Sequence, residues 1–125
     1  MKTRFAFVLP FACAIGCGSP TFDAIPASVD VSHAPQQTIE ITAQDFEFTP
    51  DEIHVKQGTL VTLKLKSIDG HHGFGLKAFG IDVDLSEGAE QSVQFYAGEK
   101  GEFAFRCTHF CGIGHLSMNG TIDVD

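Results

Sequence analysis

The chain contains no tryptophan, and its 8 lysines and arginines are outnumbered by 16 aspartates and glutamates. The resulting net charge of −8 argues against nucleic acid and against an anionic membrane surface as partners. The absence of tryptophan, together with 13 glycines and five prolines, fits a loop-rich β domain better than a helical one. A length of 125 residues leaves room for one hydrophobic core, so a single folded domain is expected.

Long apolar runs are also scarce. The run Phe5–Gly16 follows Lys2 and Arg4 and is too short to span a bilayer as a helix. This layout is typical of a secretory signal peptide. We therefore expect residues 1–16 to be removed and the mature protein to be exported.

The apolar run ends in Ala14-Ile-Gly-Cys17, which resembles the lipobox of bacterial lipoproteins. That resemblance implies that Cys17 becomes the acylated N-terminus and anchors the protein on the periplasmic side of a bacterial membrane. Ordinary signal cleavage near Gly18 is the alternative. Residues 17–37 have no sustained apolar period and are interpreted as a flexible tether that leads into a domain at 38–125.

Few cysteines remain once the leader is set aside. Cys13 lies in the leader and Cys17 is the predicted lipidation site, which leaves Cys107 and Cys111 in the domain. A pair of cysteines in an exported protein is by default a disulfide. A disulfide, however, would leave the neighbouring His115 and Met118 without a role.

From Thr38 onward the sequence shows short β segments separated by turn signals. The clearest is Leu60–Lys66, where apolar and polar residues alternate so that one face is fixed to the core. Phe46–Phe48 continues the pattern of the first strand in the opposite parity, which predicts a kink or bulge near residue 45. About eight such strands without a convincing helix predict an all-β Greek-key sandwich.

The strongest motif is Cys107-Thr-His-Phe-Cys111-Gly-Ile-Gly-His115-Leu-Ser-Met118, with the pair His71-His72 on an earlier loop. Loops at one end of a sandwich can bring these two segments together. Thiolate and thioether are soft ligands and imidazole is borderline, a set that selects copper over calcium, magnesium or manganese.

Three ligand sets are compatible with these residues. A tetrahedral zinc site could be formed by two thiolates and two imidazoles, from Cys107, Cys111, His115 and His72. It would give Met118 no role. A mononuclear blue-copper centre needs two histidines, one cysteine and a weak axial methionine, and it would leave Cys107 as a spare thiol near the metal. The third set uses both thiolates as bridges between two copper ions.

The spacing Cys107-x3-Cys111-x3-His115-x2-Met118, preceded by Asp69-Gly-His-His-Gly-Phe74, resembles the CuA cupredoxin domains of cytochrome c oxidase subunit II and of nitrous-oxide reductase. The resemblance covers roughly residues 38–125. It implies that Cys107 and Cys111 bridge two copper ions and that His72 and His115 bind one each. It also implies an axial Met118 and a backbone carbonyl donor at His109.

This resemblance implies an electron carrier and not an enzyme. Two coppers that share one unpaired electron each change charge by half a unit, so their bonds shift little on oxidation. With every ligand supplied by protein, no open position remains for a substrate. The expected partners are exported redox proteins, such as a c-type cytochrome or another cupredoxin, and membrane contact is expected only through the lipid anchor.

The chain also departs from the family. It has no tryptophan before Cys107, no apolar segment after the leader and no sign of a second domain, so neither the membrane-anchored oxidase subunit nor nitrous oxide reduction is expected. A copper chaperone or storage protein, with His71 and His109 as transfer ligands, remains the alternative. A thioredoxin-like fold is disfavoured because Gly112 and Gly114 oppose a helix, and cysteine–histidine nucleophilic catalysis gives Met118 no role.

Overall fold

The computed structural model describes residues 24–125, so the predicted signal peptide and Cys17 lie outside the described residues. Within residues 24–125 there are nine strands and two short 3₁₀ helices, and neither helix is long and apolar enough to cross a membrane. The elements are β1 (Gln36–Gln44), β2 (Glu47–Thr49), β3 (Glu52–Val55), β4 (Leu60–Ser67), β5 (His72–Leu76), η1 (Lys77–Phe79), β6 (Ile81–Leu85), β7 (Glu90–Tyr96), β8 (Gly101–Arg106), η2 (His115–Ser117) and β9 (Asn119–Val124).

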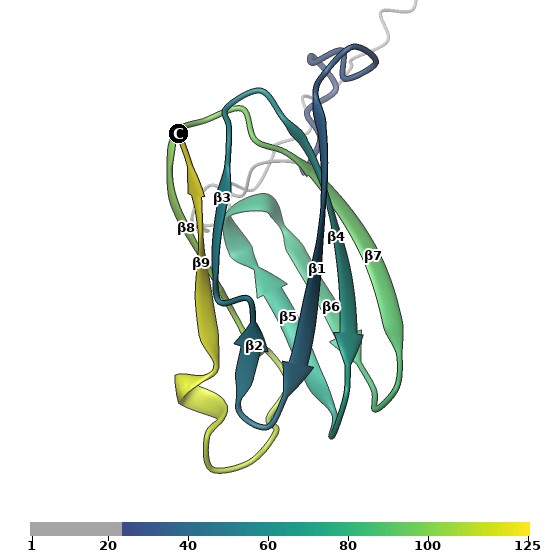
Figure 1. Cartoon of the computed structure of the whole chain (residues 1–125), viewed down its shortest axis with the longest axis vertical. Coiled ribbons are helices and arrows are strands. Elements are labelled where there is room, and N and C mark those ends of the chain that lie inside the picture. Colours follow the sequence, from purple (N-terminus) through teal and green to yellow (C-terminus); the bar gives the residue numbers. More distant parts are fainter. Residues whose placement is uncertain (1–23) are drawn as a thin grey trace, which may run out of the picture.

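The strands form two sheets that pack around one core (Figure 1). One sheet has the order β2-β1-β4-β7 and the other β3-β9-β8-β5-β6. Most neighbours are antiparallel, but β1 pairs with β4 and β3 pairs with β9 in parallel. The chain crosses between the sheets several times, for example from β3 to β4 and from β4 to β5. The predicted all-β Greek-key sandwich is confirmed.

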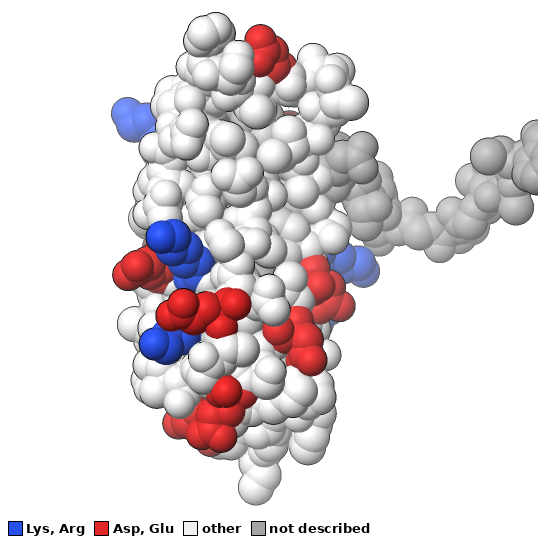
Figure 2. Space-filling view, turned by 90° about the vertical axis from the view of Figure 1, so that its right-hand side faces the viewer, with Lys and Arg blue, Asp and Glu red and all other residues white. Residues whose placement is uncertain are grey.

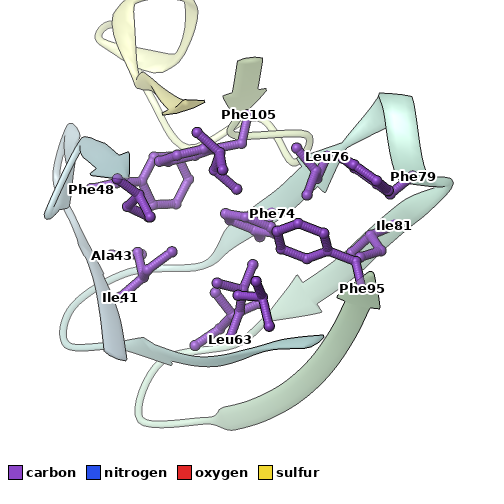
Figure 3. Close-up of a cluster of buried hydrophobic side chains, with 14 of the residues drawn as sticks. Ile41, Ala43, Phe48, Leu63, Phe74, Leu76, Phe79, Ile81, Phe95 and Phe105 are labelled. Atoms are coloured by element: carbon purple, nitrogen blue, oxygen red, sulfur yellow. The ribbon is translucent and has the colours of Figure 1, made fainter. Parts of the chain in front are cut away.

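The core is built from apolar side chains that the two sheets turn toward each other. In β4, Val61, Leu63 and Leu65 are buried while Lys64 and Lys66 are exposed, as the alternation predicts. Aromatic rings from both sheets fill the space between the layers (Figure 3). The largest fully buried aromatics are Phe74, Phe95 and Phe105.

The predicted bulge near residue 45 is wrong. The chain reverses at Asp45 and Phe46, and β2 returns antiparallel to β1 with Gln44 opposite Glu47. A tight reversal flips the side-chain parity as a bulge would, which is why the pattern alone did not separate the two. The hairpin makes 47–49 a strand of its own, so the domain has nine strands where about eight were predicted.

One end of the sandwich gathers the loops that the sequence singled out. Strand β5 begins there with His72, and the long β8–β9 connection, drawn in yellow, turns at the same end (Figure 1). The described part of the predicted tether lies against the domain elsewhere, where the backbone N–H of Tyr96 donates to the carbonyl of Ala24 over 2.8 Å. The division into leader, tether and domain stays a prediction.

Candidate metal centre

The β8–β9 connection is a closed loop. Its first residue, Cys107, donates its backbone N–H to the carbonyl of Met118 over 3.0 Å, which extends the β8–β9 ladder by one rung beyond Arg106 and Asn119. Both side chains at this rung are buried, with exposed fractions of 3% for Cys107 and 1% for Met118. The sheet therefore holds a thiol and a thioether at fixed positions at the base of the loop.

The loop folds the remaining sulfur and nitrogen groups onto this base. The Sγ atoms of Cys107 and Cys111 lie 3.6 Å apart, and both thiols are free. A disulfide would bring them to about 2.05 Å. The Sγ of Cys111 is also 3.7 Å from Nδ1 of His115 and 3.9 Å from Sδ of Met118. The loop thus places two thiols, an imidazole and a thioether around one small volume.

His72 reaches this volume from the start of β5, the strand next to β8 in the same sheet, and is fully buried. Its Nε2 lies 2.7 Å from the carbonyl oxygen of Asp69, and a carbonyl can only accept, so Nε2 carries the proton. In the neutral ring Nδ1 is then a bare lone pair, and this atom is buried without a hydrogen-bond partner. The ligand atoms of His72, Cys107 and Cys111 lie within 4.8 Å of one another.

This arrangement fits a soft metal ion. A buried acceptor without a partner costs roughly 1–3 kcal/mol, and a bound cation would satisfy it. A histidine that donates its second nitrogen to a carbonyl is oriented as metal-binding histidines usually are. The donor set of two thiols, two imidazoles and a thioether suits copper better than a hard cation.

The backbone carbonyl of His109 points toward the buried thiols, and its side chain points toward the surface. Its carbonyl oxygen is 3.0 Å from Sγ of Cys107, where the thiol donates to it. Its imidazole ring turns outward and stacks on the ring of His71, with centroids 3.8 Å apart and planes within 9°. The carbonyl therefore faces the thiol cluster, and the side chain lies at the surface.

The Cys111 thiol of the metal-free protein holds its proton. Burial raises the pKa of Cys111 to about 11, helped by its hydrogen bond to the neighbouring Cys107 thiol and by the negative charge of Asp45. A cation must displace this proton to bind Cys111 as a thiolate, so metal affinity rises with pH. The bare thiolate that the motif suggests at Cys111 thus requires the metal itself.

Two supporting interactions were not anticipated from the sequence. The carboxylate of Asp69 accepts the backbone N–H of Asp45 over 2.8 Å, which ties the β1–β2 turn to the loop that carries His72. Phe46, at the tip of that turn, covers the ligand loop: a Cβ added at Gly114 would lie 2.2 Å from Cγ of Phe46. The only sequence signal was the Asp69–Phe74 motif, which marked Asp69 without showing what it binds.

All six predicted ligand residues are brought to this end of the sandwich: His72, Cys107, His109 through its carbonyl, Cys111, His115 and Met118. Their roles as metal ligands stay a prediction.

Comparison with known proteins places this geometry in context. A family model described as "Cupredoxin-like domain" matches residues 11–123. Cytochrome c oxidase subunit 2 of Thermus thermophilus is 35% identical over 102 residues, which cover 81% of this chain and 76% of the relative. Nitrous-oxide reductase of Cupriavidus necator is 34% identical over 92 residues, covering 70% of this chain but only 14% of the reductase.

Among solved structures, the periplasmic domain of cytochrome oxidase subunit II of Bradyrhizobium japonicum superposes with a TM-score of 0.67 at 23% identity. The match covers 77% of this chain and 88% of that domain. At this identity the likeness shows the fold, and it agrees with the two sheets described above.

Proposed function

Because the chain belongs to the cupredoxin-like domain family, with homology to the CuA domains of oxidase subunit II and nitrous-oxide reductase, we propose that it binds two copper ions and relays single electrons. The residues that would hold the metal are His72, Cys107, Cys111, His115, Met118 and the carbonyl of His109. Copper, when bound, supplies a one-electron couple between Cu(I) and Cu(II).

The observation that carries the proposal is the pair of free thiols 3.6 Å apart with a bare, buried imidazole nitrogen beside them. A mononuclear blue-copper site needs one thiolate, and here the second thiol lies within the same cluster and not outside it. Zinc would use both thiols and both imidazoles, but it would leave the buried thioether of Met118 without a partner. Two thiolates with one imidazole each match a paired centre.

The chain holds these donors rigidly. Cys107 and Met118 are fixed by the sheet ladder, and His72 is fixed by the Asp69 carbonyl. Donors that move little when charge changes favour fast electron transfer, because little structural rearrangement accompanies it. His72, Cys107 and Met118 are buried, and Cys111 and His115 are half-buried. A centre whose metal positions are all taken by protein donors leaves none for a substrate, as a carrier requires.

The β8–β9 loop exposes three apolar side chains, which we call the rim, at the surface where electrons would pass. Phe110, Ile113 and Leu116 are 75%, 102% and 92% exposed, and the ring of Phe110 lies 5.5 Å from that of His115. The lowest tip of the molecule in Figure 2 carries no charged side chain on the visible face, although acidic groups lie above it. Such a rim suits brief docking of an exported redox partner, such as a c-type cytochrome or another cupredoxin.

Electron exchange tests the relay directly. We expect the reduced, copper-loaded protein to pass one electron per event to an oxidised c-type cytochrome. Stopped-flow absorbance of the cytochrome measures the rate of this transfer. The variant Leu116→Glu places a charge on the rim and is expected to slow this by about tenfold, equivalent to ~1.4 kcal/mol of docking free energy. Gln37→Glu adds the same charge on exposed β1, toward its far end, and should leave the rate unchanged. Equal rates for both variants would contradict docking through the rim.

The thioether has a separate test. Met118→Leu preserves the packing volume at a position that is 1% exposed, so the metal-free protein should lose less than about 1.5 kcal/mol of stability. The copper-loaded variant should keep its metal but show a shifted absorption spectrum and reduction potential, measured by voltammetry. An unchanged spectrum and potential would show that Met118 is core filler only.

Copper delivery is the second candidate, favoured by the exposed imidazoles of His71 and His109 beside the site. Incubating the loaded protein with a copper-chelating acceptor protein separates the two functions. A relay keeps its copper through many turnovers, whereas a delivery protein loses it rapidly to a mild acceptor.

The proposed location is the periplasmic side of a bacterial membrane, with Cys17 lipidated. The mass of the mature N-terminus tests this: a diacylglycerol-modified Cys17 is expected, and an unmodified end would rule the anchor out.

A further inference from the structure

We propose that His71, Asp84 and His109 form a second metal site, which binds one borderline divalent cation such as Zn²⁺ or Cu²⁺ at the surface beside the thiol cluster. Each residue offers one ligand atom, and these three atoms lie within 4.8 Å of one another. All three residues are exposed. None of the three side chains belongs to the ligand set described above, to which His109 contributes only its backbone carbonyl. The proposal does not depend on how many copper ions the buried cluster holds.

The fold brings these residues together from three segments. His71 immediately precedes β5, and Asp84 lies in β6, where it is paired with Gly73 of β5. His109 comes from the ligand loop, which is anchored to β6 because the hydroxyl of Thr108 donates to the carboxylate of Asp82 over 2.6 Å.

Gly73 allows the loop to approach β5 closely. A Cβ at this position would lie 2.4 Å from Oγ1 of Thr108 and 2.8 Å from the backbone nitrogen of His109. With only hydrogen there, the loop backbone rests on the strand, and the ring of His109 reaches the ring of His71. The stack of the two imidazoles is thus a product of backbone packing and not of chance contact between long side chains.

The chemistry of the cluster is that of a borderline cation site. Two imidazoles and one carboxylate are common ligands for zinc and for divalent copper, and no sulfur is present to favour a monovalent ion. Nε2 of His71 is already hydrogen-bonded to Oδ1 of Asp84. An ion that binds both atoms takes the place of the proton between them, and the neutral His71 ring then carries its proton on Nδ1. The exposed ring of His109 can turn to supply the second nitrogen.

This site is open to solvent, unlike the buried cluster, so it would bind a metal ion less tightly. His71 and Asp84 retain 43% and 69% of their side-chain exposure, so water completes the coordination and the ion exchanges freely. His72, the next residue after His71, belongs to the buried cluster, and the carbonyl of His109 faces Cys107. An ion bound here would therefore lie next to the buried cluster. His71 adjoins His72 in the sequence, and His109 contributes its ring to one site and its carbonyl to the other.

Zinc binding to the full chain with Cys107→Ser and Cys111→Ser provides the test, because the thiols no longer compete. Histidine ring NMR should show Zn²⁺ perturbing His71 and His109, and calorimetry should give about one ion per chain. His71→Gln, His109→Gln and Asp84→Asn, each added to this background, should weaken binding by at least about tenfold. His33→Gln, an exposed histidine distant in sequence, should leave the affinity unchanged.

Perturbation of His72 and His115 in place of His71 and His109 would overturn the proposal, as would equal affinities for all four added variants. A second measurement keeps the native thiols. Zn²⁺ added to the copper-loaded protein should bind with the same dependence on His71 and His109 and leave the copper absorption unchanged. Displacement of copper, or binding independent of His71, would contradict the second site.

Discussion

Replacing Cys107 with serine is expected to abolish the paired copper centre and to leave at most about one weakly held ion per chain. The thiol is buried, lies 3.6 Å from the other thiol and donates to the carbonyl of His109 over 3.0 Å. A serine hydroxyl fits the same space and can make the same hydrogen bond, so the fold should persist. Its oxygen is a hard, neutral donor that cannot bridge two soft ions.

Metal analysis and electron paramagnetic resonance of the reconstituted variant measure this loss. Ser117→Ala is the matched control, since it changes a hydroxyl in the same loop that donates only to the Gly114 carbonyl. The control should keep the wild-type copper content and spectrum. If Cys107→Ser also keeps them, the second thiol has no part in metal binding.

The largest expected effect on stability comes from Phe105→Ala, which should lower the free energy of unfolding by about 3–5 kcal/mol. The ring of Phe105 is fully buried, with its centroid 5.1 Å from that of Phe74 and 5.4 Å from that of Phe48 (Figure 3). These rings come from β8, β5 and β2. Their packing sets how β8, which leads into Cys107, lies against β5, which begins with His72. Whole domains are stable by roughly 5–15 kcal/mol, so the loss is a large share.

Urea unfolding of the metal-free protein measures this effect without the contribution of bound metal. Phe110→Ala removes an identical side chain that is 75% exposed, and it should change stability by no more than about 0.5 kcal/mol. A loss below ~1 kcal/mol for Phe105→Ala, close to that of the control, would show that the aromatic cluster does not hold the two ligand strands together.

The sequence was sufficient where the physical signal is local. The alternation in β4 reports burial directly, because a strand between core and solvent must alternate. The predicted ligands between Cys107 and Met118 all lie in the single connection between β8 and β9. Their closeness in space therefore follows from their closeness in sequence. That His72 joins them required only that both loops be at the same end of a sandwich.

Other features depend on contacts that no local pattern contains. The proton position on His72 is set by the Asp69 carbonyl, and Asp69 is held by the backbone of Asp45, which is 24 residues earlier. Phe46 looked like a continuation of a strand because a hairpin and a bulge give the same change of parity. The stack of His71 on His109 arises only when the ligand loop packs on Gly73.

The central claim is that two thiols at the tip of this sandwich bind a pair of copper ions that share one electron. Copper content and the electron paramagnetic resonance spectrum of the reconstituted wild-type protein test it most directly. The account predicts about two copper ions per chain and a spectrum split by two equivalent copper nuclei. One ion per chain with splitting from a single nucleus, or no copper bound by the reduced protein, would contradict it.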